Sequence, residues 1–377
     1  MTLLGFRGVH PIMLFFFPFA LAALSGGFWL LWRRPGAVSK SARRVYLASY
    51  ACMALAFVLG WPLARAQGKY LLMYYLCAVA AFAVPGLLLA GSCLAGKPRV
   101  QGPHQPSRRR FLAGGTVAVA GGLISLAGVE ALAGDGPQVA ERRIEVERHP
   151  KARGGRELRL SLVTDLHAGF FLPGEHLEQA LVRIEAFRPD AILFGGDLVE
   201  NELGCLDQTR SFLEGLAAMA PAFAVIGNHD TYISADAVAA FLRLRGVIPL
   251  RGECAPLAGP WGSFNLCGMR DVFEPELDHG ILRRNPPETT IMLAHNPQQA
   301  LMASAGAVPW LTLSGHTHGG QIRLPGVGAL VNQADRRIGP GLNRVDGRMV
   351  AVSAGLGYSG LPVRLGCPPD VTNIVVS

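Results

Sequence analysis

The chain is poor in charge: only 16% of its 377 residues are Asp, Glu, Lys or Arg, whereas half of them are hydrophobic. The mean hydropathy is accordingly positive, at +0.30. Ordinary soluble domains contain roughly 25% charged residues, so this composition argues against a wholly soluble protein and predicts a membrane portion.

The first third lacks any charged residue over four long stretches, 11–32, 45–64, 70–96 and 111–129. Each stretch approaches the ~20 residues that a helix needs to cross a bilayer. Buried core helices are the alternative interpretation, but none of the four shows the amphipathic stripe of a surface helix, so we predict four transmembrane helices. Because the first three contain no ionisable Asp, Glu, Lys or Arg, we expect them to anchor the chain and not to conduct ions.

The net charge of +8 would suit a nucleic-acid binder, but residues 134–377 hold 22 Lys and Arg against 26 Asp and Glu. The positive excess therefore lies in the N-terminal part, and no nucleic-acid partner is predicted. Ten basic residues lie in the loops 33–44 and 97–110, against three in the N-terminal tail and the loop 65–69. Basic loops stay in the cytoplasm, which predicts a multi-pass protein of the cytoplasmic membrane whose C-terminal domain lies on the outer side.

The segment 107–112, SRRRFL, resembles a twin-arginine export signal, and it is followed by the apolar stretch 113–129. The same arginines also suit the cytoplasmic flank of a membrane helix, and both interpretations predict the same orientation. The triplet 131–133, ALA, resembles a cleavage site, but the preceding Glu130 favours a retained helix. The predicted organisation is a membrane region with three helices at 1–106, the twin-arginine-like segment with the fourth helix at 107–136, and a catalytic domain at 137–377.

The chain lacks any C-x-x-C spacing, which argues against a structural zinc site or dithiol redox chemistry. Four cysteines of the C-terminal part, Cys205, Cys254, Cys267 and Cys367, could form two disulfides in an oxidising compartment. A bridge between Cys254 and Cys267 across a short loop is one such pairing.

From residue 137 onward the chain has no internal repeat, and short apolar runs alternate with helical stretches, which is typical of an α/β domain. We expect helices at 175–187, 205–219 and 236–245. We expect strands at 158–164, 191–194, 222–226, 290–293, 311–313, 349–353 and 371–376.

Polar blocks follow the first five of these strands: TDLH at 164–167, GGD at 195–197, GNHD at 227–230, AHN at 294–296 and GHTH at 315–318. In α/β sheets the loops at strand ends converge and form ligand sites. Any one block could be a structural turn. With His229, Asp230 and Asn296 set aside, they supply two Asp, one Asn and four His, which is the ligand inventory of two divalent metals with oxygen and imidazole ligands.

The five blocks, in this order, resemble the signature of the calcineurin-like metallophosphoesterase superfamily: D-x-H, G-D, G-N-H-D or G-N-H-E, H and G-H-x-H. The resemblance covers about residues 155–377. GHTHGGQIRLP at 315–325 and RLGCPP at 364–369 resemble a branch of bacterial membrane-tethered phosphoesterases, which includes twin-arginine-exported enzymes and enzymes acting on UDP-diacylglucosamine. The resemblance implies an α/β fold in which two mixed β-sheets pack face to face between helices.

The resemblance also implies a site for two divalent metal ions. The first would be held by Asp165, His167, Asp197 and His318, and the second by Asp197, Asn228, His295 and His316, so that Asp197 bridges them. Histidine ligands favour manganese, iron or zinc over calcium or magnesium. His229 is expected to stabilise the transition state or to protonate the leaving oxygen, with Asp230 orienting its ring.

These observations predict a membrane-anchored, metal-dependent phosphohydrolase that cleaves a phosphodiester or pyrophosphate bond, with an envelope or lipid-linked substrate. One alternative is a UDP-diacylglucosamine pyrophosphohydrolase of lipid A synthesis, whose catalytic domain would have to face the cytoplasm, against the charge bias of the loops. The other is a catalytically silent envelope-binding module, which the complete ligand set disfavours.

Overall fold

A computed structural model describes residues 138–377, except for 151–154, 170, 276, 305, 325, 330 and 361–363. The four predicted transmembrane helices and the twin-arginine-like segment lie outside these residues. Within the part that is described, no helix combines the length and the apolar character needed to cross a bilayer.

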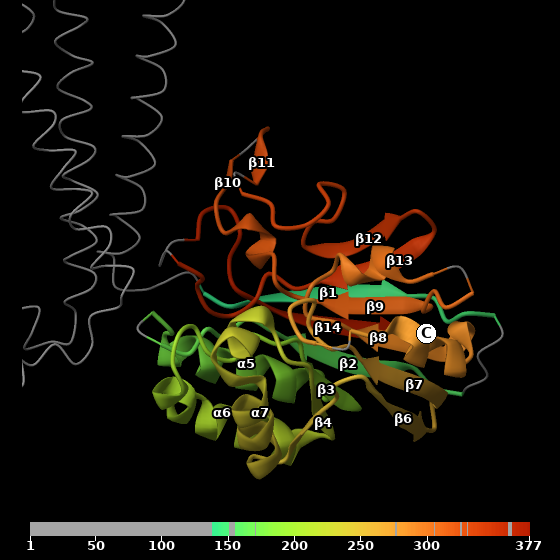
Figure 1. The fold of residues 1–377 in the computed structure, drawn as a ribbon, viewed down its shortest axis with the longest axis horizontal. Coiled ribbons are helices and arrows are strands. Elements are labelled where there is room, and N and C mark those ends of the chain that lie inside the picture. Colours follow the sequence, from blue (N-terminus) through green and yellow to red (C-terminus); the bar gives the residue numbers. More distant parts are fainter. Residues whose placement is uncertain are drawn as a thin grey trace, which may run out of the picture. The chain divides into compact units, whose positions relative to one another are not determined.

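Two six-stranded mixed sheets form the framework of the domain (Figure 1). In the first sheet, β2, β3, β4 and β5 are parallel, whereas β14 runs antiparallel to β2 and parallel to β1. Its strands, in spatial order, are β1 (Ala140–Val146), β14 (Asp370–Val376), β2 (Leu158–Val163), β3 (Ala191–Phe194), β4 (Ala222–Ala224) and β5 (Val247–Pro249).

The second sheet has a parallel centre, in which β13, β9, β8 and β7 are neighbours, and an antiparallel strand at each edge. Its strands, in spatial order, are β12 (Gly341–Val345), β13 (Arg348–Val352), β9 (Leu311–Ser314), β8 (Thr290–Leu293), β7 (Gly262–Gly268) and β6 (Glu253–Gly259). A short antiparallel pair, β10 (Arg323–Leu324) and β11 (Gly328–Ala329), follows the last predicted metal-binding block.

Helices gather on one side of the first sheet, where Figure 1 shows α5, α6 and α7 beside β2, β3 and β4. These helices are α5 (Gly174–Phe187), α6 (Arg210–Met219), which follows the short helix η1 (Leu203–Thr209), and α7 (Asn228–Leu244). The outer side of the second sheet is covered by α8 (Gln299–Met302) and η2 (His279–Arg284), while η3 (Pro287–Thr289) and η4 (His318–Gly320) are single turns.

The side chains of β3 alternate between the second sheet and the helices, and they show how these layers pack together. Leu193 packs in the core between the two sheets with Leu293 of β8 and Leu313 of β9. Its neighbours Ile192 and Phe194 point to the other face, where they pack with the helices. Successive side chains of a strand point to opposite faces, so a wholly apolar strand must be covered on both. The predicted fold class, two mixed sheets packed between helices, is thereby confirmed.

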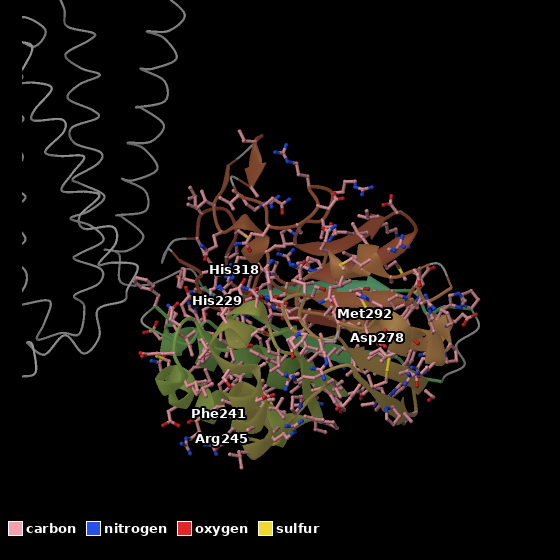
Figure 2. All side chains as sticks on the ribbon, viewed as in Figure 1. His229, Phe241, Arg245, Asp278, Met292 and His318 are labelled. Atoms are coloured by element: carbon pink, nitrogen blue, oxygen red, sulfur yellow. A yellow bond between two sulfur atoms is a disulfide. The ribbon has the colours of Figure 1, made fainter. Side chains whose placement is uncertain are left out.

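Cys254 and Cys267 lie directly opposite each other on β6 and β7 and form a disulfide, which Figure 2 draws as a yellow bond. The pairing considered from the sequence is therefore confirmed. Among the described cysteines, Cys205 and Cys367 are free thiols.

Candidate metal centre

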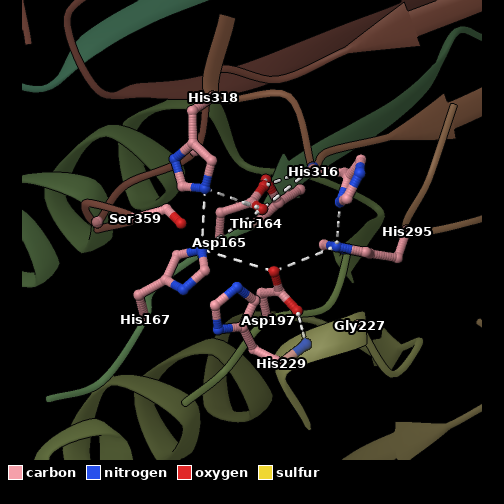
Figure 3. Close-up of polar contacts among 12 residues, drawn as sticks. Thr164, Asp165, His167, Asp197, Gly227, His229, His295, His316, His318 and Ser359 are labelled. Atoms are coloured by element: carbon pink, nitrogen blue, oxygen red, sulfur yellow. Dashed lines mark hydrogen bonds and ion pairs between the residues drawn. The ribbon is translucent and has the colours of Figure 1, made fainter. Parts of the chain in front are cut away.

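The turns after β2, β3, β4, β8 and β9 bring all seven predicted metal ligands into one cluster. Figure 3 labels all of them except Asn228. Strands of both sheets contribute, so residues from distant parts of the sequence meet at one end of the sheets. Five of the seven have a backbone φ between 47° and 69°: Asp165, His167, Asp197, His316 and His318. That left-handed region is uncommon for residues with a side chain, and such strain concentrates at functional sites.

Two glycines allow the turns to approach one another. A Cβ atom on Gly315 would lie 2.3 Å from Oδ2 of Asp165, and one on Gly227 would lie 2.1 Å from Oδ1 of Asp197. No side chain fits at such distances. The glycines beside the predicted ligands are therefore required by the close packing of the backbone around the cluster.

The first group of candidate ligands joins Asp165, His167 and His318, whose ligand atoms lie within 4.8 Å of one another. The Nε2 atoms of His167 and His318 face each other at 2.9 Å. Nε2 of His318 lies 3.5 Å from Oδ1 of Asp165, and Nε2 of His167 lies 3.6 Å from Oδ2 of Asp197. Two imidazole nitrogens and two carboxylate oxygens thus point to a common centre.

The second group joins Asp197, His295 and His316. Nε2 of His295 lies 3.2 Å from Oδ2 of Asp197, 3.1 Å from Nδ1 of His316 and 3.0 Å from Oδ1 of Asn228. The same Oδ2 atom of Asp197 borders both groups. Asp197 therefore has the position expected of a residue that bridges two ions.

His295 and His167 each have an acceptor at the ring nitrogen Nδ1, as histidines that bind metals through Nε2 commonly do. Nδ1 of His295 lies 2.8 Å from the backbone oxygen of Gly195, and Nδ1 of His167 lies 2.5 Å from Oε2 of Glu200. A ring that donates its Nδ1 proton to such an acceptor presents an unprotonated Nε2 to a metal. The donor set, made of carboxylate, amide and imidazole groups with no thiolate, fits two divalent ions.

The charge balance of the cluster calls for cations. Burial alone would raise the pKa of Asp197, but the charges of His295 and His167 outweigh it and hold this pKa well below its usual range. Burial would lower the pKa of His295, yet Asp197 outweighs it and raises the pKa to about 10. Burial and the nearby His295 lower the pKa of His316 to about 3. A proton on His295 thus offsets the carboxylate charge, while His316 keeps a free lone pair.

His229 lies at the edge of the cluster, with 24% of its side chain exposed. Its backbone N–H donates to Oδ1 of Asp197 at 2.9 Å, and its ring centroid lies 4.7 Å from that of His167. Nδ1 lies 2.9 Å from the backbone oxygen of Glu200 and 3.3 Å from Oε2 of the same residue. A ligand atom of its ring also lies within 4.8 Å of those of His167 and Asp197, so the geometry permits either a catalytic or a ligand role.

Asp230 does not orient the ring of His229, and this expectation was wrong. Its buried carboxylate accepts hydrogen bonds from the backbone N–H groups of Leu198 (2.9 Å), Val199 (3.1 Å) and Gly227 (3.0 Å). Consecutive residues of a helix point about 100° apart, so Asp230 faces away from the neighbouring ring. Burial, reinforced by the charge of Asp197, raises the pKa of Asp230 to about 7. Its carboxylate ties the loop after β3 to the start of α7.

Replacing Asp230 by alanine should therefore destabilise the domain. Three buried N–H groups would lose their acceptor, which we expect to lower the free energy of unfolding by about 2–3 kcal/mol. Urea unfolding of the detergent-solubilised full chain at pH 8 measures the change. Asp236→Ala on the same helix is the matched control, because that side chain is 89% exposed and its loss should change the free energy of unfolding far less. Equal effects of both variants would contradict the assignment.

Glu200 is the residue of the site that sequence analysis missed. It contacts Nδ1 of both His167 and His229, at 2.5 Å and 3.3 Å. Burial would raise its pKa, but the hydrogen bond to His167 and the charges of both histidines lower it. The only sequence signal is an acidic side chain three positions after Asp197, in the same loop.

Arg364, the first residue of the RLGCPP stretch, is buried behind His318. Its Nη2 atom donates to the backbone oxygens of Ala354 (2.8 Å) and Gly357 (2.6 Å), and lies 3.3 Å from Nδ1 of His318. The guanidinium therefore links the loop after β13 to His318, a candidate ligand of the first group.

Comparison with known proteins agrees with this geometry. The model of the calcineurin-like phosphoesterase family matches residues 158–320, which include every predicted ligand. The chain is 31% identical over 245 residues to an uncharacterized metallophosphoesterase of Helicobacter pylori, covering 62% of each chain. It is 32% identical over 225 residues to phosphodiesterase YaeI of Escherichia coli, covering 57% of this chain and 80% of the relative.

A third relative is a transmembrane protein with metallophosphoesterase domain from Danio rerio, 31% identical over 263 residues. The match covers 64% of this chain and 57% of that protein. The chain thus spans less than two thirds of the length of the Helicobacter pylori and Danio rerio relatives.

Proposed function

The chain belongs to the calcineurin-like metallophosphoesterase family, and from this premise we propose that it cleaves a phosphodiester or pyrophosphate bond at a centre of two divalent metal ions. That it is a metal-dependent phosphoester hydrolase follows from the family. The observation that carries the finer proposal is the position of Asp197 Oδ2 between two groups of converging imidazole nitrogens. Asp165, His167 and His318 would hold one ion and Asn228, His295 and His316 the other.

When bound, two divalent ions lower the pKa of an attacking water and offset the charge that grows on the phosphoryl oxygens. The residues of this chain supply the rest. Asp197 and Asp165 are buried, and their two carboxylates would offset only part of the charge of two bound ions, so the site would still attract a phosphate anion. Imidazole ligands favour manganese, iron or zinc.

We assign His229 the role of the acid that protonates the leaving oxygen. Its Nδ1 lies 3.3 Å from Oε2 of Glu200, whose pKa is lowered, so an ionised carboxylate faces this side of the ring. Nε2 is then the atom left to reach the substrate. The partly exposed side chain of His229 fits contact with a ligand, in contrast to the buried His167 and His295 beside it.

The activity is tested with the full chain in detergent, stripped with a chelator and reloaded with Mn²⁺. Hydrolysis of bis(4-nitrophenyl) phosphate should appear only after the metal is restored. A protein that binds Mn²⁺ but hydrolyses neither this diester nor a nucleoside diphosphate sugar would instead be the catalytically silent binding module.

For location, we propose that the catalytic domain lies outside the cytoplasmic membrane and acts on an envelope or lipid-linked phosphoester. The excess of basic residues in the loops 33–44 and 97–110 supports this orientation. The naming of the Danio rerio relative as a transmembrane protein agrees with a membrane anchor. The choice of an envelope or lipid-linked substrate rests on this location alone.

The Cys254–Cys267 disulfide provides a test of the orientation inside cells. Disulfides persist outside the cytoplasm and are reduced within it. In acid-quenched cells, we expect both cysteines to resist alkylation until a reductant is added, while the free thiol of Cys205 reacts in both samples and serves as the internal control. Alkylation of Cys254 and Cys267 without reductant would contradict the outer location and restore the cytoplasmic UDP-diacylglucosamine pyrophosphohydrolase.

A further inference from the structure

Two large aromatic side chains are exposed next to the metal centre. Tyr232 is 62% exposed and Phe273 is 58% exposed, and their ring centroids lie 5.3 Å apart. The ring of Tyr232 lies 6.0 Å from the ring of His229. The two rings therefore extend outward from the residue to which we assign proton transfer. Exposed apolar surface at such a place is typical of a binding site.

Tyr232 is anchored at its hydroxyl end. It lies four residues after Asn228 on α7, hence on the same face of the helix. Its hydroxyl forms a hydrogen bond with the side chain of Asn228. The hydroxyl thus points to a candidate ligand of the second ion, while the ring remains open to solvent.

Phe273 is carried by a rigid turn. Its backbone N–H donates to Oδ1 of the buried Asp271 at 3.0 Å, and the N–H of Asp271 donates to Oε1 of Glu274 at 3.2 Å. Glu274 in turn is paired with Arg251 at 2.6 Å. Oδ2 of Asp271 has no hydrogen-bond partner in the described part of the chain. The backbone that carries the exposed ring is therefore held in place, so little backbone freedom remains to be lost when a ligand binds.

We propose that Tyr232 and Phe273 form a subsite for an aromatic leaving group of the substrate, such as an aryl or nucleoside alcohol. At 5.3 Å and a tilt of 55°, the two rings leave no slot between them, so a third ring packs across their exposed faces or edges. The assignment to the leaving side rests on the proposed function, since His229 marks that side only if it protonates the leaving oxygen.

The experiment uses benzyl methyl phosphate with the Mn²⁺-loaded full chain. Benzyl alcohol and methanol are similarly poor leaving groups, so the ratio of the two released alcohols reports which group occupies the leaving side. We expect benzyl alcohol to exceed methanol by about 10-fold, the scale of one aromatic contact. Phe273→Ala should bring the ratio near one. Leu244→Ala, which removes a 76% exposed side chain at the far end of α7, should leave the ratio unchanged.

Because the two alcohols compete within one molecule, the ratio does not depend on metal loading or total activity. Hydrolysis with an equal ratio, or with the same ratio in Phe273→Ala, would overturn the subsite and leave the proposed function standing. Cyclohexylmethyl methyl phosphate carries a saturated ring in place of the benzyl ring. If cyclohexylmethanol exceeds methanol by the same factor, the aromatic character of the subsite is overturned. If bis(4-nitrophenyl) phosphate is cleaved and benzyl methyl phosphate is not, no alkyl leaving oxygen is protonated, and the assignment of the subsite to the leaving side is overturned. If neither is cleaved, the proposed phosphodiester hydrolysis fails as well.

Discussion

Asp197→Asn is expected to reduce the metal content of the protein from two ions to at most one per chain and to lower phosphodiester turnover at least about 1,000-fold. The physical reason is the place of Oδ2, which lies 3.6 Å from Nε2 of His167 and 3.2 Å from Nε2 of His295. An amide of the same shape has a single oxygen and no charge, so it cannot neutralise two neighbouring cations. A loss of several kcal/mol of transition-state stabilisation corresponds to this change in rate.

Elemental analysis of the purified full chain, together with bis(4-nitrophenyl) phosphate turnover, checks this expectation. His316→Ala is the matched comparison, because His316 contacts only the second group and its loss should leave one ion bound. Two ions retained in Asp197→Asn would show that this carboxylate does not bridge them, and two ions retained in His316→Ala would remove that histidine from the ligand set.

The positions of the ligands could be predicted from the sequence because each follows a strand. A parallel strand buried on both faces is apolar throughout, so its end is marked by an abrupt change of residue type, as in β3, where Phe194 is followed by Gly195, Gly196 and Asp197. Parallel neighbours place these ends at the same edge, which is why Asp165 and Asp197 meet although 31 residues separate them. Hydrophobic pattern and topology together predicted the polar blocks at this edge, whereas the choice of individual ligands came from the resemblance to the metallophosphoesterase superfamily.

Side-chain direction could not be predicted in the same way. Asp230 is adjacent to His229 in the sequence but points to backbone N–H groups of the loop after β3, whereas Glu200 reaches His229 from 29 residues away. The beginning of α7 was also missed. Its first turn, from Asn228, faces the metal cluster and is polar, and Ser234, at φ −174° and ψ 97°, interrupts the helix before its apolar part. Apolar periodicity detects only the face of a helix that packs against a core.

His229→Ala is expected to leave two metal ions bound and to lower the turnover of an alkyl phosphodiester at least about 100-fold, the scale of general acid catalysis. An alkoxide leaves poorly without a proton, whereas 4-nitrophenolate leaves as an anion. The same variant should therefore lose much less activity on bis(4-nitrophenyl) phosphate than on dimethyl phosphate or benzyl methyl phosphate.

The contrast between the two kinds of ester separates the roles that the geometry of His229 permits. A metal ligand, or a group that stabilises charge on the phosphoryl oxygens, acts on both esters alike, so equal losses would reject proton transfer to the leaving group. Loss of an ion would identify His229 as a ligand, in line with its proximity to His167 and Asp197. His279→Ala in η2 provides the control for removal of an imidazole outside the cluster, and it should change neither metal content nor the ratio of the two rates. A selective loss on the alkyl ester alone would leave proton donation as the role that accounts for the contact between His229 and Glu200.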